Sequence, residues 1–434
     1  MEISPQSRRQ AEDLLHFIDA SPSPWHAVRT MADRLRAQGF AELREDERWR
    51  LVPGGRHFVV RGGSSIVAFA VGGEAVDQAG FRLVGAHTDS PGLRVKPKAA
   101  HVADGVARIG VEVYGGPILA TFADRDLGLA GRVAVRGAAG AEMRLVHVAE
   151  PLLRLPNLAI HMNREVNENG LKFNKQTELP LLLGAAAGDA DAAGGFRALL
   201  AARAGVAAGD VLGWELAVCD TQPGAFWGAD REFVAASRLD NLASCHAGLS
   251  ALLAGGAAAA TRVCAFFDHE EVGSESAAGA GGSFVADVLR RVAAAGGLDE
   301  EGWRCALARS FFVSADMAHA WHPNFSAAYE PAHRVAVNGG PVIKSNANQR
   351  YSTGADSAAR FALCCERAGV PCQQYAHRTD LGCGSTIGPI VAARLGVTSV
   401  DVGSPMWAMH SLRESAGALD HGYMIAALAA VFAG

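Results

Sequence analysis

The sequence lacks any block of basic residues, and the formal net charge of its 434 residues is only −5. A nucleic-acid partner is therefore not expected. It also lacks an apolar run that could span a membrane, because its most apolar stretches, such as residues 251–260, are short and rich in alanine and glycine. Residues 1–20 have the pattern of an amphipathic helix and not the ordered regions of a secretory signal. We therefore expect a cytoplasmic protein with no membrane partner.

Two residue types are used in an unusual way. The eight cysteines form no CxxC pair and several lie within apolar runs, so we expect buried free thiols in a reducing compartment. Lysine is scarce, because only five of the 40 basic residues are lysines: Lys96, Lys98, Lys172, Lys175 and Lys344. Arginine and lysine differ in shape and hydration, so each lysine departs from the preference of this sequence for arginine.

The length and the 49% content of hydrophobic residues favour a sizeable core and two or more domains. Helical patterns and short apolar strands fill residues 1–95, and helices alternate with apolar strands from Ser237 onward, which is typical of an α/β sheet covered by helices. Between residues 96 and 231 the pattern changes to period-two segments separated by glycines, such as GVARIGVEVYGG. We predict a discontinuous α/β domain, residues 1–95 and 232–434, interrupted by an inserted β-rich domain, residues 96–231.

Six segments place acidic or histidine side chains just after an apolar strand, where ligands collect in open α/β sheets. These segments are residues 84–90, 237–241, 266–274, 312–320, 379–389 and 404–411, and they offer His87, Asp89, Asp240, Glu270, Glu271, Asp316 and His410. Two histidines with several carboxylates suit zinc, manganese or cobalt. The carboxylates exceed what one tetrahedral ion uses, which favours two divalent ions about 3.5–4 Å apart.

Each of these residues also has a plainer explanation when it is taken alone. A histidine after a strand is usually structural, Asp240 has the position of a helix N-cap, and Glu270 with Glu271 could be a solvated strand end. Their joint occurrence in an α/β context favours a metal site.

The chain resembles the aspartyl aminopeptidase family of dinuclear metallo-aminopeptidases nearly from end to end. The motifs that carry the resemblance include FIDASPSPWHAV, GAHTDSPGLRVKP, LAIHMNREVN, SRLDNL, DHEEVGS, SADMAHA, VIKSNANQRYST, GCGSTIGPI and MHSLRE. The resemblance implies a mixed-sheet zinc-peptidase domain with helices on both faces, and an inserted oligomerisation domain. It also implies a tetrahedral dodecamer whose active sites face an inner chamber.

The resemblance assigns roles to the clustered residues. His87 and Asp316 would hold one metal ion, Glu271 and His410 the other, and Asp240 would bridge them. Asp89 would orient the imidazole of His87. Glu270 would stay unligated as the general base, because a metal-bound carboxylate cannot take a proton. The order of the two glutamates comes from the resemblance alone.

Four further residues have roles only through the resemblance. His319 would assist at the substrate carbonyl oxygen, with a surface histidine near a turn as the alternative. His161 would reach the active site of a neighbouring subunit, with core packing as the alternative. Gly384 and Ser385, in the glycine-rich segment 382–385, would lead into a helix whose amides meet the substrate, or would form a plain turn.

Lys344 would match the side chain of an N-terminal Asp or Glu, and its compact ammonium suits a small pocket beside the metals. We therefore expect an aminopeptidase that acts on peptides with a free N-terminus, prefers acidic first residues and binds two divalent ions, with zinc favoured over manganese or cobalt. Three alternatives remain open: a broad or apolar specificity, a catalytically silent scaffold of the same fold, and a deacylase or carboxypeptidase with a similar dinuclear site.

Overall fold

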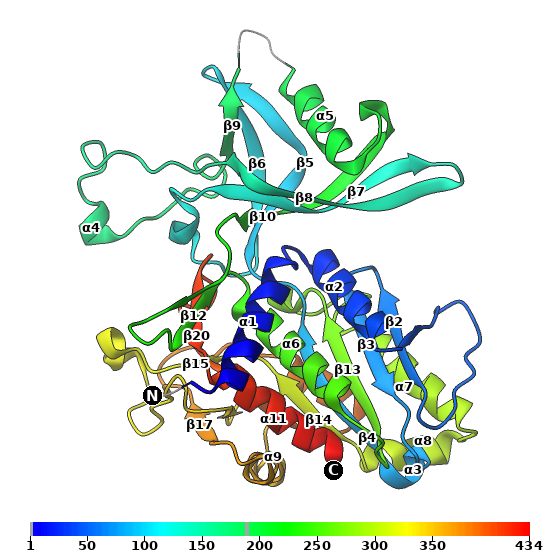
Figure 1. The fold of residues 1–434 in the computed structure, drawn as a ribbon. Coiled ribbons are helices and arrows are strands. Elements are labelled where there is room, and N and C mark those ends of the chain that lie inside the picture. The colour runs from blue at the N-terminus through cyan, green and yellow to red at the C-terminus, as the bar shows by residue number, and fades with distance from the viewer. Residues whose placement is uncertain (1–2, 187–190) are drawn as a thin grey trace. The chain divides into compact units, whose positions relative to one another are not determined.

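The computed structural model describes residues 3–186 and 191–434. The chain forms two compact units (Figure 1). The first comprises the residues up to 89, 224–409 and 414–434, and the second comprises 90–223 and 410–413. All eight cysteines are free thiols, and five of them are buried, as predicted. In the described residues, no helix is both long enough and apolar enough to cross a membrane.

The first unit is built on a nine-stranded mixed sheet with the strand order β1-β2-β3-β13-β4-β14-β18-β16-β17. The neighbouring strands β13, β4, β14 and β18 are parallel, and β3 runs antiparallel to β13. Parallel strands end at the same edge of a sheet, so the chain that follows these strands collects there. The bounds are β1 (Ala41–Glu42), β2 (Arg56–Arg61), β3 (Ser65–Ala70), β4 (Phe81–His87), β13 (Thr261–Phe267), β14 (Phe311–Ala315), β16 (Val342–Ser345), β17 (Gln373–Ala376) and β18 (Thr398–Gly403).

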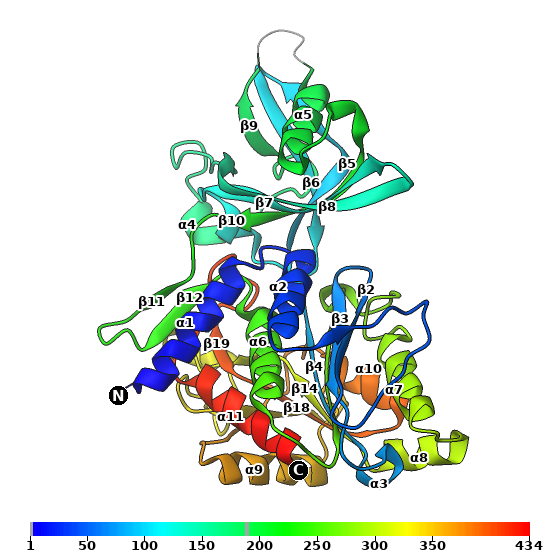
Figure 2. The same cartoon turned by 45° about the vertical axis from the view of Figure 1, so that its right-hand side comes forward.

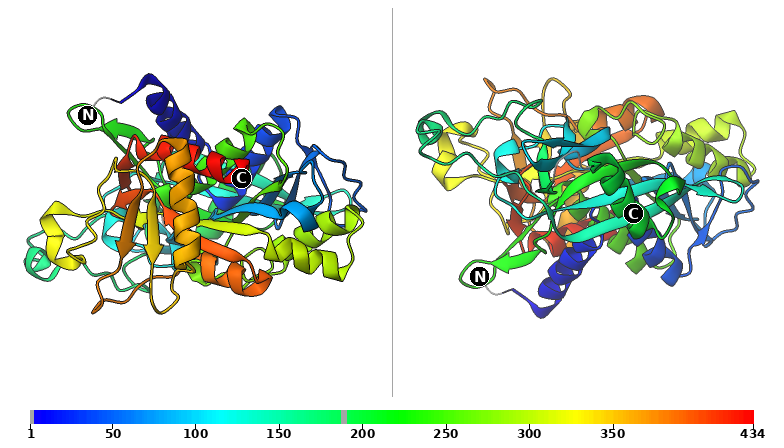
Figure 3. Two further views of the ribbon diagram at one scale, coloured as in Figure 1. Left: turned by 90° about the horizontal axis from the view of Figure 1, so that it is seen from below. Right: turned by 90° about the horizontal axis from the view of Figure 1, so that it is seen from above.

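Helices cover both faces of this sheet (Figure 2), which confirms the predicted α/β class. One face packs under α1 (Pro5–Asp19), α2 (Pro24–Ala37), α6 (Leu239–Ala254), α9 (Ala355–Ala368) and α11 (Asp420–Ala433). The other packs under α3 (Val76–Ala79), α7 (Phe284–Ala295), α8 (Glu300–Ala308) and α10 (Ile387–Leu395). In the view from below, α9 lies beside α11 (Figure 3).

The segment SPSP, residues 21–24, separates α1 from α2 and starts the second helix. Ser23 accepts the backbone N–H of His26, and Pro24 is the first helical residue, where its missing N–H costs nothing. Ser4 and Pro5 start α1 in the same way.

A smaller five-stranded sheet completes the first unit, in the order β11-β12-β20-β19-β15. Its strands are β11 (Ala225–Trp227), β12 (Phe233–Ala236), β15 (Ala318–His319), β19 (Pro405–Trp407) and β20 (Glu414–Gly417). Two short 3₁₀ helices, η3 (Glu270–Val272) and η4 (Pro323–Ala328), lie in loops of this unit.

The second unit contains a six-stranded antiparallel sheet in the order β8-β7-β10-β5-β6-β9. Its elements are β5 (Gly92–Ala103), β6 (Val106–Tyr114), η1 (Leu119–Phe122), β7 (Leu127–Gly137), β8 (Gly140–Leu153), α4 (Val166–Asn169), β9 (Leu181–Ala185), α5 (Ala192–Ala204), η2 (Ala208–Asp210) and β10 (Val211–Asp220). Its limits differ from the predicted insert, residues 96–231. The strand β5 already starts at Gly92, and β11 pairs with β12 in the first unit.

Candidate metal centre

The candidate centre is assembled from chain segments that leave the parallel strands at one edge of the large sheet. His87 is the last residue of β4, and Asp316 directly follows β14. After β13 the chain turns at His269, which has a left-handed backbone (φ 65°), and Glu270 and Glu271 form the start of η3. Asp240 lies at the start of α6, before regular helical geometry begins. The carboxylates that follow the apolar strand β13 are therefore turned back toward β4.

Three groups of side chains each bring candidate ligand atoms within 4.8 Å of one another. The groups are His87 with Glu270 and Glu271, His87 with Asp240 and Asp316, and Asp240 with Glu271 and His410. The last two groups are the two ligand sets implied by the resemblance, and Asp240 belongs to both. Nδ1 of His410 lies 3.1 Å from the carbonyl oxygen of Gly116, an arrangement that leaves Nε2 for a ligand bond.

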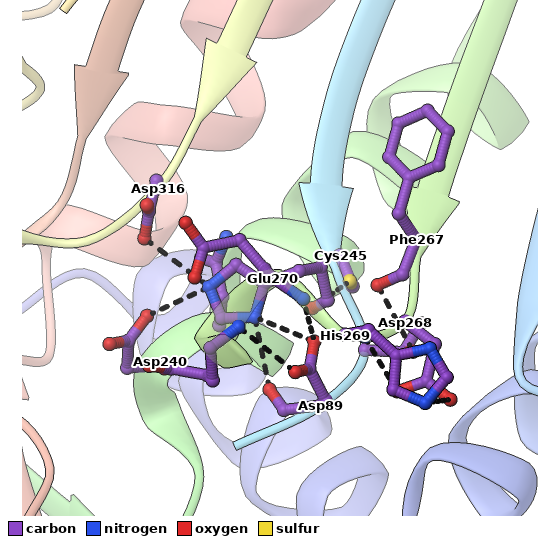
Figure 4. Close-up of polar contacts among 12 residues, drawn as sticks. Asp89, Asp240, Cys245, Phe267, Asp268, His269, Glu270 and Asp316 are labelled. Carbon is purple, nitrogen blue, oxygen red and sulfur yellow. Dashed lines mark hydrogen bonds and ion pairs between the residues drawn. The ribbon is translucent and has the colours of Figure 1, made fainter. Parts of the chain in front are cut away.

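The distances around His87 fit ligands of a common ion better than they fit hydrogen bonds. Nε2 of His87 lies 3.5 Å from Oδ1 of Asp240 and 3.6 Å from Oδ1 of Asp316. Figure 4 shows the carboxylates of Asp240 and Asp316, each at the end of a dashed line that marks one of these contacts. Two ligands at about 2.0–2.2 Å from a tetrahedral zinc ion are separated by roughly 3.3–3.6 Å. Good N–H···O hydrogen bonds are shorter, about 2.7–3.2 Å. The donor set and its spacing therefore suit a divalent ion.

Asp89 connects the histidine to both glutamates. Its Oδ1 accepts the backbone N–H of Glu270 and its Oδ2 accepts that of Glu271, each at 3.1 Å. Nδ1 of His87 lies 3.0 Å from the backbone carbonyl oxygen of Asp89 and 3.5 Å from its carboxylate. Asp89 is fully buried, so this one residue can fix the imidazole orientation and the turn that carries the two glutamates.

Without metal ions, burial and the neighbouring charges change the pKa values of Glu270 and His87. Burial, followed by the charges of Asp316, Glu271 and Asp89, raises the pKa of Glu270 to about 9, although His87 opposes this. Burial would lower the pKa of His87, but the carboxylates of Asp240, Asp316 and Asp89 outweigh it and raise this pKa well above 6.5. Excess negative charge in a buried site favours a bound cation.

Three residues that support the centre were not predicted from the sequence. Oε2 of the buried Glu414 accepts the backbone N–H of Asp240 at 3.0 Å. Nδ2 of Asn241 donates to the carbonyl oxygen of Ala315 at 2.8 Å, and Sγ of Cys245 donates to that of His87 at 3.1 Å. Glu414 lies in the MHSLRE motif, and its place just before an apolar stretch was the only sequence signal for it.

Lys344 lies beside the centre and is almost completely buried, with 2% of its surface exposed. Its Nζ donates to the carbonyl oxygens of Asp316 at 2.9 Å and Met317 at 3.2 Å, and it lies 5.1 Å from the ring centre of Tyr351. Among the described residues, no carboxylate is within ion-pair distance of this ammonium. Lys344 is therefore a buried ammonium group with no acidic partner among the residues that the structure describes.

His319 is in the short strand β15, half-buried, with its ring 5.9 Å from that of Tyr375 and 6.3 Å from that of His377. The Tyr375 hydroxyl lies 2.6 Å from Nδ1 of His377. Tyr375 and His377 were not predicted as neighbours of His319, because nothing in the sequence indicates that β17 brings them there.

The structure does not gather the remaining predicted residues into the metal groups. Gly384 and Ser385 are exposed, Oγ of Ser385 donates to the carbonyl oxygen of Arg350 at 3.1 Å, and the N-cap of α10 is Thr386. His161 lies in the second unit, in an exposed turn between β8 and α4, which excludes core packing.

Comparisons with known proteins agree over nearly the whole chain. Residues 17–432 match the family model described as "Aminopeptidase I zinc metalloprotease (M18)". A "Probable M18 family aminopeptidase 2" of Pseudomonas paraeruginosa is 47% identical over 427 residues, which cover 97% of each chain. A solved structure, "Cryo-EM structure of the Ape4 and Nbr1 complex", has a TM-score of 0.95 and 38% identity, over 100% of this chain and 87% of that one. A second solved structure, of the S. cerevisiae mApe1 dodecamer, has a TM-score of 0.84 and 25% identity, over 98% of this chain and 97% of that one.

Proposed function

Because the chain belongs to the M18 family of zinc metallo-aminopeptidases, we propose that it removes N-terminal Asp and Glu residues from peptides with a free N-terminus. One observation supports this specificity. The ammonium group of Lys344 is buried beside the candidate metal centre and has no carboxylate partner among the described residues. Leaving a charge buried without an opposite charge is costly, and a substrate carboxylate would supply the missing partner. Lysine has three N–H donors, and two of them bond to carbonyl oxygens, so one remains for that carboxylate.

The proposed centre would hold two divalent ions. His87 and Asp316 would hold one ion and Glu271 and His410 the other, with Asp240 common to both groups; the three-residue groups around His87 and His410 support this division. When bound, the ions would acidify a water molecule and polarise the carbonyl of the first peptide bond.

Glu270 is the proposed general base. Its carboxylate takes a proton from the attacking water and later gives that proton to the leaving amine. The backbone N–H of Glu270 bonds to Asp89, which holds the residue in place while its side chain stays available for proton transfer. His319 is the proposed donor to the substrate carbonyl oxygen. The nearby rings of Tyr375 and His377 restrict its motion.

The proposed assembly is a homododecamer, because a related structure is a dodecamer and the match covers almost all of both chains. The exposed position of His161 leaves it accessible to a neighbouring subunit. Light scattering tests the assembly, and a fully active monomer would remove any role of His161 in a neighbour's active site. A cytoplasmic location stays a prediction.

A release assay on peptides that start with Asp, Glu, Leu or Lys tests the specificity. We expect the highest kcat/KM for Asp and Glu, and a selective loss for these two substrates in Lys344→Met. A preference for Leu that Lys344→Met leaves unchanged would reject the acidic specificity in favour of the broader alternative. Activity on N-acylated peptides would instead favour the deacylase or carboxypeptidase reading. Fewer than two metal ions per chain, with no hydrolysis after metal addition, would favour the scaffold.

A further inference from the structure

Two arginines at the opposite end of β13 from the metal centre face each other across one small residue. Ala70 of β3 pairs with Arg56 of β2 on one side and with Arg262 of β13 on the other. Residues paired across adjacent strands point to the same face of a sheet, so both arginines and Ala70 share one face. Two strand spacings separate their Cα atoms by about 9.5 Å, a distance that two arginine side chains can span.

A cavity of about 200 Å³ lies between these two side chains. Arg56 and Arg262 are the only charged residues that line it, and the other lining residues are glycines, alanines and one valine. Ala70, which lies between the two arginines in the sheet, also lines the cavity. The cavity is smaller than the 300–1,000 Å³ typical of sites for larger organic ligands, and it has no large apolar side chain to receive one.

The charge of the two guanidinium groups is not balanced within the described part of the chain. Arg56 and Arg262 form no ion pair with a carboxylate there, whereas many other arginines of this protein do. Arg262 is buried, with 6% of its surface exposed, and its Nε has no hydrogen-bond partner among the described residues. The two positive charges repel each other across the cavity, and the buried Nε of Arg262 lacks a hydrogen-bond partner, whereas Arg56 is exposed and its guanidinium lies 5.9 Å from the ring centre of Phe40.

The proton affinity of Arg262 agrees with this geometry. Burial lowers the pKa of Arg262, and the positive charge of Arg56 lowers it further. The side chain is nevertheless held in place, because its Nη2 donates to the carbonyl oxygen of Gly256, just after α6, at 2.6 Å. Arginine has five N–H donors, so several remain for a ligand in the cavity.

We propose that this arginine pair, with the cavity between Arg56, Ala70 and Arg262, binds a small tetrahedral dianion of the phosphate type. A phosphate group carries a charge of about −1.5 to −2 at neutral pH, which matches two guanidinium groups better than a single carboxylate does. Arginine binds phosphate oxygens with two parallel N–H donors. The source is either free inorganic phosphate or the phosphate group of a small ester.

This site is separate from the metal centre. Arg262 is the second residue of β13, and Glu270 follows the other end of the strand, which places the two sites roughly 20 Å apart at the usual rise per residue. The ligand would therefore act on the stability of the first unit, where it joins β2 to β13 and to the residues after α6.

Thermal unfolding of the metal-loaded protein tests the proposal. Millimolar phosphate, at an ionic strength held constant with sodium chloride, is expected to raise the Tm along a saturating curve. The variant Arg56→Gln should lose this response, whereas Arg304→Gln, an exposed arginine that pairs with Glu300 on α8, should keep it. An equal rise in wild type and Arg56→Gln, or no rise in wild type, would overturn the proposal.

A second variant tests whether the cavity itself is needed and not only the charge, and a direct measurement counts the bound phosphate. Ala70→Val narrows the cavity without a change of charge, and its Tm should likewise not respond to phosphate. Equilibrium dialysis with radiolabelled phosphate should find one more phosphate per chain in wild type than in Arg56→Gln, since phosphate at the metal centre is common to both. Competition by glycerol phosphate would identify an ester as the ligand, and its failure would leave inorganic phosphate. Aminopeptidase activity without phosphate should be the same in Arg56→Gln and wild type.

Discussion

Oδ1 of Asp89 accepts the backbone N–H of Glu270 at 3.1 Å. The second oxygen of the same carboxylate accepts the N–H of Glu271 at the same distance, so one buried side chain fixes both residues of the turn. This bidentate arrangement makes the two glutamates a rigid pair. Their different proposed roles therefore depend on side-chain direction and not on different backbone support.

Replacing Asp89 tests this support. In Asp89→Asn, an amide group replaces one of the two acceptor oxygens, and one backbone N–H of the turn loses its partner. We expect a loss of metal affinity of about 10–100-fold, as for other residues that orient metal ligands. Isothermal titration with zinc measures this, and Asp268→Asn is the matched control, because Asp268 accepts the N–H of His269 and not that of either glutamate. Equal affinities of Asp89→Asn and wild type would contradict the supporting role.

The two glutamates should separate in their effects. Glu270→Gln should retain two metal ions per chain but lose turnover by a factor of about 10² to 10⁴, because its amide cannot accept the proton. Glu271→Gln should lose metal instead. Elemental analysis and kcat values from the same protein samples measure both effects, and a reversal of the two phenotypes would exchange the assigned roles.

Lys344 should also matter for stability. In Lys344→Met the carbonyl oxygens of Asp316 and Met317 lose their donor while they stay buried, which costs roughly 1–3 kcal/mol per unsatisfied group. We expect a lower Tm for the metal-free variant than for metal-free wild type. An unchanged Tm would mean that the two carbonyl groups find other partners. Comparison of kcat/KM for acidic and apolar substrates separates this effect from specificity.

Asp420 predicts a pH dependence of stability that is independent of the metal centre. Burial raises its pKa from 3.8 to about 7, although the N–H groups of Asn338 and Gly340 oppose the shift. Between these pH values the folded protein binds a proton that the unfolded chain does not bind. The contribution is therefore fully present below pH 4 and is lost as the pH rises through about 7.

Denaturant unfolding at several pH values measures this contribution. Relative to Asp420→Asn, wild type should lose up to about 4 kcal/mol between pH 4 and 7, since one pKa unit corresponds to about 1.36 kcal/mol. The exposed Asp230 provides the control, and Asp230→Asn should have the pH profile of wild type. Parallel profiles of wild type and Asp420→Asn would show that Asp420 does not hold the extra proton.

Many residues of the candidate metal centre could be predicted to lie together, because adjacent acidic side chains directly after a buried apolar strand are unusual. The apolar run from Val263 to Phe267 ends in adjacent acids, and such a pattern requires a compensating charge when the strand is central. His87 is the last residue of β4 and Asp316 directly follows the neighbouring parallel strand β14, so the sheet topology brings them together. The proposed order of the ligands rests on the motif resemblance, because periodicity alone does not contain it, and it stays a prediction.

Other features could not be predicted, because they depend on contacts between distant side chains and backbone atoms. The two N–H groups that bond to Asp89, the carbonyl oxygens that bond to Lys344 and the bond from Asp240 to Glu414 leave no pattern in the sequence. The predicted limits of the inserted domain, residues 96 and 231, differ from those of the second unit for a similar reason. Glycine and period-two patterns mark strands but not the sheet that each strand joins, so the assignment of β5 and β11 required the three-dimensional pairing.

The positions of the proposed ligands along the chain have a consequence for the time during synthesis at which the centre can form. The first, His87, precedes the last, His410, by most of the 434 residues, and the strands between them must pair before the group is assembled. A ribosome-bound chain therefore has no complete centre until almost all of it has been synthesised. Until that point, the proposed centre cannot cleave the N-terminus of its own chain.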